Sequence, residues 1–186
     1  MNVVELHHRA VDAFDGRVAA VTEEQWEQAT ELPGWSVRTL VNHLVNENKW
    51  TPPLLAGSRI EDVGDRFDGD LLGADPPAAW KESAAEAKAA VTEEAAERTV
   101  HLSFGDAPGS EYVMQLFADH FIHSWDLARA VGGDVRLDPE LVDACAQWFS
   151  SVEDDYRKAG AIGDAPEVPP GADAQTALLA RFGRKA

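Results

Sequence analysis

The stretch from residue 110 to residue 131 constrains this chain most strongly, because its pattern is typical of one long helix. Ser110-Glu111 resembles a helix start, and Gly132-Gly133 ends it. Within it, Asp119 and His123 stand four residues apart, so their side chains lie about one helical turn apart on the same side. Two such side chains can bind one divalent ion, and a third ligand from another helix would leave coordination positions open.

The same residues also fit a simpler interpretation. Gln115, Asp119, Asp126 and Arg129 cluster within about 80° of the helix circumference, with His123 at the edge of that arc. A solvated polar stripe explains them without any metal. A catalytic ion must be reachable by solvent, however, and ligands at the border between polar stripe and core satisfy that requirement. Both interpretations remain open at this point.

A second helix is predicted from the N-cap Ser36 toward Trp50, with Pro52-Pro53 ending or kinking it. On this helix Arg38, Asn42 and Lys49 fall within about 40° of one another, which predicts the solvated side.

His43 lies on the opposite side of that helix, among leucines, and so points inward. A buried imidazole needs partners for its ring nitrogens. Metal coordination is one way to provide them. The alternative is a hydrogen bond to a backbone carbonyl or to Glu47, one turn further on.

The remaining elements follow from spacing, caps and breakers. Four or five long helices and one small β element predict an all-α bundle, and we expect a single domain over residues 1–186. The expected elements are a helix over 3–20, a capped turn at 22–26, a loop at 57–75, a helix from Asp75 to Ala96, a short β element near residues 99–105, a helix from 138 to 159, a loop at 160–171, and an extra C-terminal helix at 174–182.

Composition excludes several classes of function. A net charge of -17 argues against a nucleic-acid partner or an anionic membrane surface, because binding phosphate requires a cationic face. The N-terminus lacks a basic segment followed by an apolar run, and no window approaches the roughly 18 uninterrupted apolar residues of a membrane span. We therefore expect a cytoplasmic, soluble protein.

Other site chemistries lack their motifs. There is no phosphate-binding glycine loop and no serine-hydrolase elbow. Cys145 has no basic neighbour in sequence, which favours a buried structural thiol over a nucleophile. Trp35, Trp50 and Trp125 are expected to pack rather than bind, and His120 is expected to be a packed ring rather than a donor to a metal ligand.

Two motifs resemble a known family. The run Leu32-Pro33-Gly34-Trp35-Ser36-Val37-Arg38-Thr39-Leu40-Val41-Asn42-His43-Leu44 resembles the second-helix signature of the DinB-like metal-binding four-helix bundles. The His-Ser-Trp-Asp-Leu-Ala-Arg-Ala core between Asp119 and Ala130 is similar to the fourth-helix motif of their actinobacterial branch, which is related to mycothiol-dependent maleylpyruvate isomerase.

The resemblance implies the fold and a ligand set. In the isomerase a histidine of the first motif and an acid and a histidine of the second hold the metal, which matches His43, Asp119 and His123 here. Two departures limit the transfer. The isomerase has glutamate at the position of Asp119, and it carries a further C-terminal domain, whereas this sequence ends soon after Phe182.

These expectations combine into one functional hypothesis. Two imidazoles and one carboxylate suit a divalent ion, with zinc expected and nickel or iron as alternatives. We expect a metal-dependent thiol S-transferase or isomerase that activates a mycothiol-type thiol or a water toward a small electrophile. Glu47 and Asp126 are candidates for orienting ligands or handling protons, although surface acids are common.

Two other classes of function stay open. One is a non-catalytic bundle that senses a ligand or holds a structural ion, and that could form a homodimer. The other is a scaffold that needs no metal at all.

Overall fold

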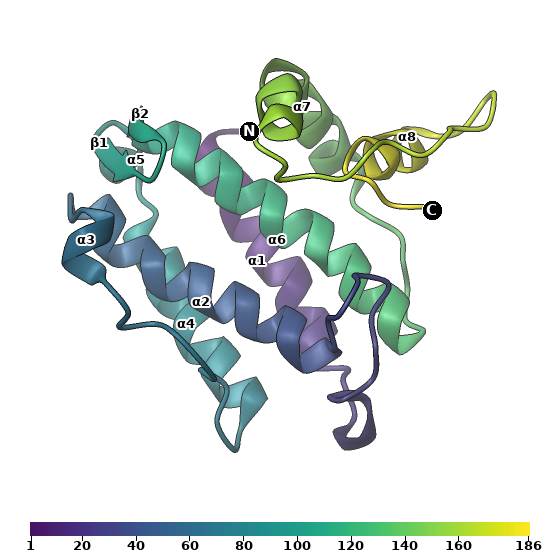
Figure 1. The fold of residues 1–186 in the computed structure, drawn as a ribbon, viewed down its shortest axis with the longest axis horizontal. Helices are drawn as coiled ribbons and strands as arrows, with labels where there is room; N and C mark the ends of the chain where they lie inside the picture. The colour runs from purple at the N-terminus through teal and green to yellow at the C-terminus, as the bar shows by residue number, and fades with distance from the viewer. The chain divides into compact units, whose positions relative to one another are not determined.

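The computed structural model describes all residues 1–186, and its regular structure is almost entirely helical (Figure 1). The predicted all-α class with a short β element near residues 99–105 is confirmed. None of the helices is both long enough and apolar enough to span a membrane. The elements are α1 (Val3–Val18), η1 (Glu23–Gln25), α2 (Val37–Leu55), α3 (Ile60–Val63), α4 (Pro76–Ala90), α5 (Glu93–Ala96), β1 (Thr99–Leu102), β2 (Gly105–Pro108), α6 (Gly109–Val131), α7 (Pro139–Lys158) and α8 (Ala174–Arg181).

Four helices, α1, α2, α4 and α6, form a four-helix bundle. Helices α1 and α2 each pack against both α4 and α6, which closes the ring of contacts (Figure 1). These helices belong to a compact unit over residues 1–135, and residues 136–186 form a second compact unit in which α7 packs against α8. The predicted bundle is therefore confirmed for the first unit.

The predicted caps set where the long helices begin and end. The Ser36 hydroxyl accepts a hydrogen bond from the Thr39 amide at 3.2 Å, so α2 begins at Val37. Gly132 ends α6 in the left-handed conformation, with φ of 70°. Because the caps fix the helix starts and ends, they also fix where His43 lies along α2 and where Asp119 lies along α6.

The predicted helix from Asp75 to Ala96 is wrong over its last six residues. Helix α4 ends at Ala90, Val91 is extended, and the Thr92 hydroxyl accepts from the Ala95 amide at 3.1 Å to start the separate helix α5. A β-branched pair followed by acids favours a new N-cap over continuation of the helix. The alanine-rich composition concealed this break.

Two further boundaries differ from expectation. Helix α2 continues to Leu55 with Pro52 and Pro53 in its last turn, because the Ala56 amide still donates to the Pro52 carbonyl at 3.0 Å. The predicted loop at 57–75 contains the single-turn helix α3.

Polar side chains on the predicted solvated side of α2 bind the loop over residues 57–75 and do not face only solvent. Arg38 donates to Asp70 at 2.8 Å, Asn42 to the Gly69 carbonyl at 3.0 Å and Asn46 to the Phe67 carbonyl at 2.7 Å. These anchors stand at four-residue intervals on one face of α2, so the loop runs along the helix.

Strand β1 pairs with β2 as an antiparallel hairpin, with Thr99 opposite Pro108 and Leu102 opposite Gly105. The short β element expected near residues 99–105 is thus the first strand of a hairpin, and residues 105–108, where it was expected to end, form the second strand. Gly109 follows it directly and starts α6, where its backbone lies against α5.

Replacing Gly109 with alanine is expected to destabilise the protein by about 2 kcal/mol, because a Cβ there would overlap the Ala95 carbonyl oxygen and backbone cannot yield as a side chain can. Denaturant unfolding measures the change. Gly16→Ala is the matched control, since a Cβ at that helical glycine meets nothing. Equal stabilities of the two variants would contradict the close packing.

A buried polar layer separates two apolar clusters in the bundle. Phe14, Leu44 and Trp80 belong to one cluster, and Leu54 and Leu116 belong to the other. Each bundle helix contributes a fully buried polar side chain to the layer between them, and these side chains are His7, Asn48, Ser83 and His120.

Hydrogen bonds connect most of this layer. His120 bonds the Leu116 carbonyl through Nδ1 at 2.8 Å and Asn48 through Nε2 at 3.0 Å, and Asn48 donates to Ser83 at 3.2 Å. His120 is therefore a packed ring in a hydrogen-bonded layer, as its position on the apolar side of the helix predicted. Burial lowers its pKa to about 4, so the ring is neutral near pH 7 and its single N–H donates to only one of these two oxygens.

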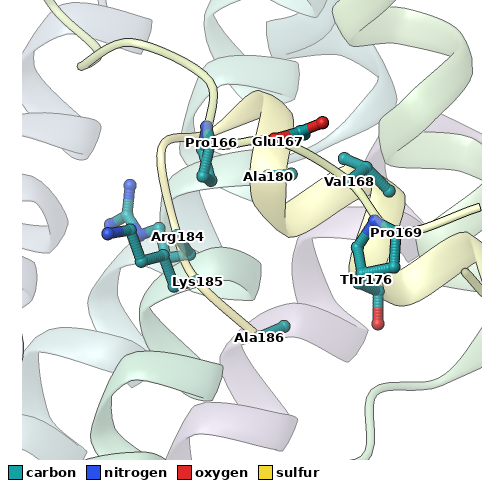
Figure 2. A pocket seen from close by; sticks show the side chains of 9 residues that line it. All are labelled: Pro166, Glu167, Val168, Pro169, Thr176, Ala180, Arg184, Lys185 and Ala186. Atoms are coloured by element: carbon teal, nitrogen blue, oxygen red, sulfur yellow. The ribbon is translucent and has the colours of Figure 1, made fainter.

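The second unit contains a cavity of about 380 Å³ at its C-terminal end (Figure 2). The residues 166–169 line one side and the chain from Thr176 to Ala186 lines the other (Figure 2). No predicted site residue contributes to it.

Cys145, on α7, is buried, and burial raises the pKa of its thiol to about 12, so it stays protonated as a structural thiol would.

Candidate metal centre

The structure brings together the three side chains that the sequence singled out as metal ligands. His43 extends from α2, while Asp119 and His123 extend from α6 one turn apart. One ligand atom from each lies within 4.8 Å of the other two. A single ion can therefore contact all three side chains. No other acid, histidine or cysteine belongs to this group.

The carboxylate of Asp119 lies between the two imidazoles. His43 Nε2 donates to Asp119 Oδ2 at 2.9 Å, and His123 Nε2 forms an ion pair with Asp119 Oδ1 at 3.4 Å. The partner of His43 is thus Asp119 rather than Glu47. Because both imidazoles present Nε2 to the same carboxylate, three donor atoms of the kind that bind divalent transition metals face one point.

In this cluster, attraction between the carboxylate and the imidazoles shifts the pKa values more than burial does. Burial alone would raise the pKa of Asp119, but the two neighbouring imidazoles hold it well below its usual range. Burial alone would lower the pKa of His123, but Asp119 and Asp126 raise it to about 9. The pKa of His43 is raised against burial in the same way, chiefly by Asp119. Both imidazoles are therefore protonated more readily than a free histidine, and His123 carries a positive charge at neutral pH.

Asp126 fixes the orientation of His123. Its Oδ2 accepts from His123 Nδ1 at 2.8 Å, and the Asp126 side chain is only 3% exposed. An imidazole whose Nδ1–H is bound to a carboxylate directs Nε2 toward the opposite side. Here that side is where Asp119 lies.

Glu47 lies one turn beyond His43 on α2, and its carboxyl group makes no hydrogen bond or ion pair. Burial, reinforced by repulsion from Asp119, raises the pKa of its carboxyl group to about 7. A carboxyl group that is half-protonated near neutral pH and has no partner can accept or release a proton readily.

Trp35 is the residue at this centre whose placement the sequence did not reveal. Its ring lies 5.2 Å from the His43 ring and is stacked on the His123 ring at 5.9 Å with 20° between the planes. Trp50 and Trp125 lie elsewhere: Trp50 contacts Phe67, and Trp125 is buried beneath Arg129. The only sequence signal is that Trp35 stands eight positions before His43, with a short cap that leads straight into α2.

Comparison with known proteins identifies relatives. The family model described as the mycothiol maleylpyruvate isomerase N-terminal domain matches residues 7–128, which include all three proposed ligands. Uncharacterized proteins from two strains of Mycobacterium tuberculosis, CDC 1551 / Oshkosh and ATCC 25618 / H37Rv, are each 34% identical over 190 residues, covering 97% of this chain and 98% of the relative.

Two solved structures share the fold. The crystal structure of the mycothiol-dependent maleylpyruvate isomerase has a TM-score of 0.58 at 16% identity, covering 76% of this chain and 65% of that one. A histidine-to-alanine mutant of it gives 0.57 at 16% identity, with coverages of 68% and 60%. This chain thus spans less than two thirds of the length of either structure, and the likeness concerns the fold.

Proposed function

Because this chain belongs to the family of the mycothiol maleylpyruvate isomerase N-terminal domain, we propose that it binds a divalent metal ion through His43, Asp119 and His123 and catalyses thiol chemistry there. The proposed activity is that of a metal-dependent S-transferase or isomerase, with a mycothiol-type thiol and a small electrophile as substrates. The observation that carries the proposal is the convergence of three ligand atoms from two helices within 4.8 Å.

The donor set fits such an ion. Two imidazole nitrogens and one carboxylate suit zinc, which we propose as the metal, with nickel or iron as alternatives. The Nε2 atoms of both imidazoles face the Asp119 carboxylate. A bound cation would replace the protons on these two nitrogens. A bound divalent ion would supply a positive charge that stabilises a thiolate near neutral pH.

The surrounding side chains have separate roles in this proposal. Asp126 keeps the Nδ1–H of His123 engaged, so that Nε2 remains the ligand atom. Glu47 accepts the S–H proton of an incoming thiol, which leaves a thiolate and a neutral carboxyl group. Its raised pKa of about 7 allows both states at neutral pH.

The metal content of untagged wild-type protein and of the His43→Ala variant tests the proposal. We expect about one ion per chain in the wild type and a loss in the variant larger than the roughly 10- to 100-fold that removal of an outer partner causes. His101→Ala is the matched control, because His101 lies in the hairpin and pairs with Asp106. Equal metal in wild type and His43→Ala would reject the site, and a fourth protein ligand on the ion would favour a structural metal over catalysis.

A further inference from the structure

A row of polar side chains continues along the interface between α2 and α6, beyond the proposed metal centre. His43, Glu47 and Thr51 stand at four-residue intervals on α2, so they share one face of that helix. Tyr112 stands seven residues before Asp119, which is close to two turns, and shares its face of α6. The hydrogen bond between His43 and Asp119 joins these two faces.

The direction of the two helices places Tyr112 opposite Thr51. Helices α2 and α6 pack against each other and run in opposite directions (Figure 1). Tyr112 lies about 10.5 Å along α6 from Asp119. Thr51 lies about 12 Å along α2 from His43, in the same direction across the bundle. Tyr112 and Thr51 therefore stand at nearly the same level, one turn beyond Glu47.

The hydroxyl group of Tyr112 is an unused donor. The residue is 5% exposed, and its hydroxyl oxygen is shut off from solvent without a hydrogen-bond partner. Burial raises the pKa of this phenol, and the Glu47 carboxyl group is the next largest influence on that pKa. The phenol thus keeps its proton, and it lies near Glu47. A buried donor without an acceptor is costly, so this hydroxyl calls for a partner.

Two acceptors on α2 lie near the Tyr112 hydroxyl. One is the Thr51 hydroxyl, which donates to the Glu47 carbonyl at 2.8 Å and so can only accept from Tyr112. Thr51 lies close enough to influence the pKa of Tyr112, but the two hydroxyls form no hydrogen bond of ordinary geometry. The other is the Glu47 carboxyl group, which has no partner. A carboxylate accepts a hydrogen bond more strongly than a neutral hydroxyl does, so Glu47 is the better acceptor.

The charges around Glu47 favour an uncharged donor. Asp119 repels the Glu47 carboxylate, while His43 and His123 attract it. A divalent ion held by those three ligands would attract it as well. A phenol stabilises the carboxylate by a hydrogen bond and adds no cation that would repel the bound ion.

We propose that Tyr112 is a positioning residue for Glu47. Its O–H donates to one oxygen of the Glu47 carboxylate, which leaves the other oxygen to accept a proton at the metal centre. The S–H proton of the thiol moves to that free oxygen, and Tyr112 keeps its own proton throughout. This inference rests on the proposed function, because the role of Glu47 as proton acceptor is part of that function.

Raman spectra of tyrosine test the hydrogen bond. The chain has two tyrosines, so in a Tyr156→Phe background Tyr112 alone gives the tyrosine doublet, whose intensity ratio reports whether the hydroxyl donates. At pH 8, above the Glu47 pKa of about 7, we expect the ratio of a strong donor. Glu47→Leu should remove this signature, and Thr51→Val should retain it. The reverse result, or a ratio that neither substitution changes, would overturn the inference.

The rate of proton loss from a bound thiol tests the consequence. The probe is 2-mercaptoethanol at saturating concentration on protein loaded with Co²⁺, and the appearance of the thiolate absorption band at pH 7 is followed. Tyr112→Phe should slow this rate about 10-fold, as for loss of one hydrogen bond to a charged group. Its Co²⁺ content should equal that of the wild type, because Tyr112 is not a ligand.

Tyr156→Phe is the matched control, since Tyr156 lies on α7 against Trp148 and Phe149. It should leave both the rate and the Co²⁺ content unchanged. A wild-type rate in Tyr112→Phe would overturn the inference and leave the proposed function intact. Wild-type protein that holds no Co²⁺, or holds it without a thiolate band, would overturn the proposed function, and the role of Tyr112 with it.

Discussion

Replacing Asp119 with asparagine is expected to abolish metal binding and to destabilise the metal-free protein by about 2–3 kcal/mol below pH 6.5. The amide has nearly the shape of the carboxylate but no charge. It is a weak ligand for a divalent ion, and it leaves the half-buried His43 and the buried His123 without the anion between them. Metal titration and denaturant unfolding measure the two effects separately.

The pH dependence follows from the direction of the shift. The pKa of His123 is about 9 when folded and 6.5 without the fold, so the folded state holds this proton more tightly. Its stabilisation is fully present below pH 6.5 and is lost as the pH rises through 9. The stability difference between wild type and Asp119→Asn should therefore be largest near pH 6 and smaller above pH 9.

Asp119→Glu is the matched control, since it keeps the charge on an arm longer by one methylene. It should retain metal binding, although the ligand distances change. If Asp119→Asn bound metal as tightly as the wild type, the carboxylate would not be a ligand. If the stability difference between the wild type and Asp119→Asn did not change with pH, the ion pairs would not be formed in solution.

Replacing His7 with leucine is expected to stabilise the protein by about 1–3 kcal/mol at neutral pH. His7 is fully buried in the polar layer, and neither of its ring nitrogens has a hydrogen-bond partner. Such groups lose their hydration and gain nothing in return. Leucine has a similar volume and no polar atoms, so it suits the site better.

The gain should grow in acid. Burial, followed by the nearby His120, His8 and Lys88, holds the pKa of His7 well below 6.5, so the unfolded chain takes up a proton that the folded chain refuses. Wild-type stability therefore falls as the pH drops below 6.5, by up to about 1.4 kcal/mol per unit. Thermal unfolding from pH 8 to pH 5 measures this.

His8→Leu is the control for His7, since His8 is its half-buried neighbour and bonds the Lys88 carbonyl at 3.1 Å. It should give no stabilisation. A His7→Leu variant less stable than the wild type would show that the imidazole has a partner in solution, such as a buried water.

Local signals predicted most of the helices. Ser36, Asp75 and Asp138 cap their helices through side-chain oxygens, and Gly132 ends α6, as their residue types indicate. The errors fall where local preferences compete. Val91 and Thr92 interrupt an alanine-rich run because a capping hydroxyl outweighs helix propensity, and Pro52 stays within α2 although it lacks the N–H that a helical residue donates to the carbonyl four residues earlier.

The candidate site was predicted in its parts but not in its arrangement. The four-residue spacing places Asp119 and His123 on one side of a helix, whatever that helix packs against. His43 lies 76 residues away from Asp119 in the sequence. Its position decides between a metal site and a solvated polar stripe as the interpretation of Asp119 and His123. Nothing local decides whether His43 bonds a backbone carbonyl, Glu47 or Asp119.

The sequence by itself determined the helices, their caps and the resemblance that pairs His43 with the motif on α6, because these depend on neighbours within one or two turns. Only the tertiary structure decided that α2 and α6 pack with His43 against Asp119, that the Trp35 ring lies beside both imidazoles, and that His7 lacks a partner. The reason is physical: hydrogen bonds and charges between distant segments form only when the bundle's apolar clusters bring the helices together.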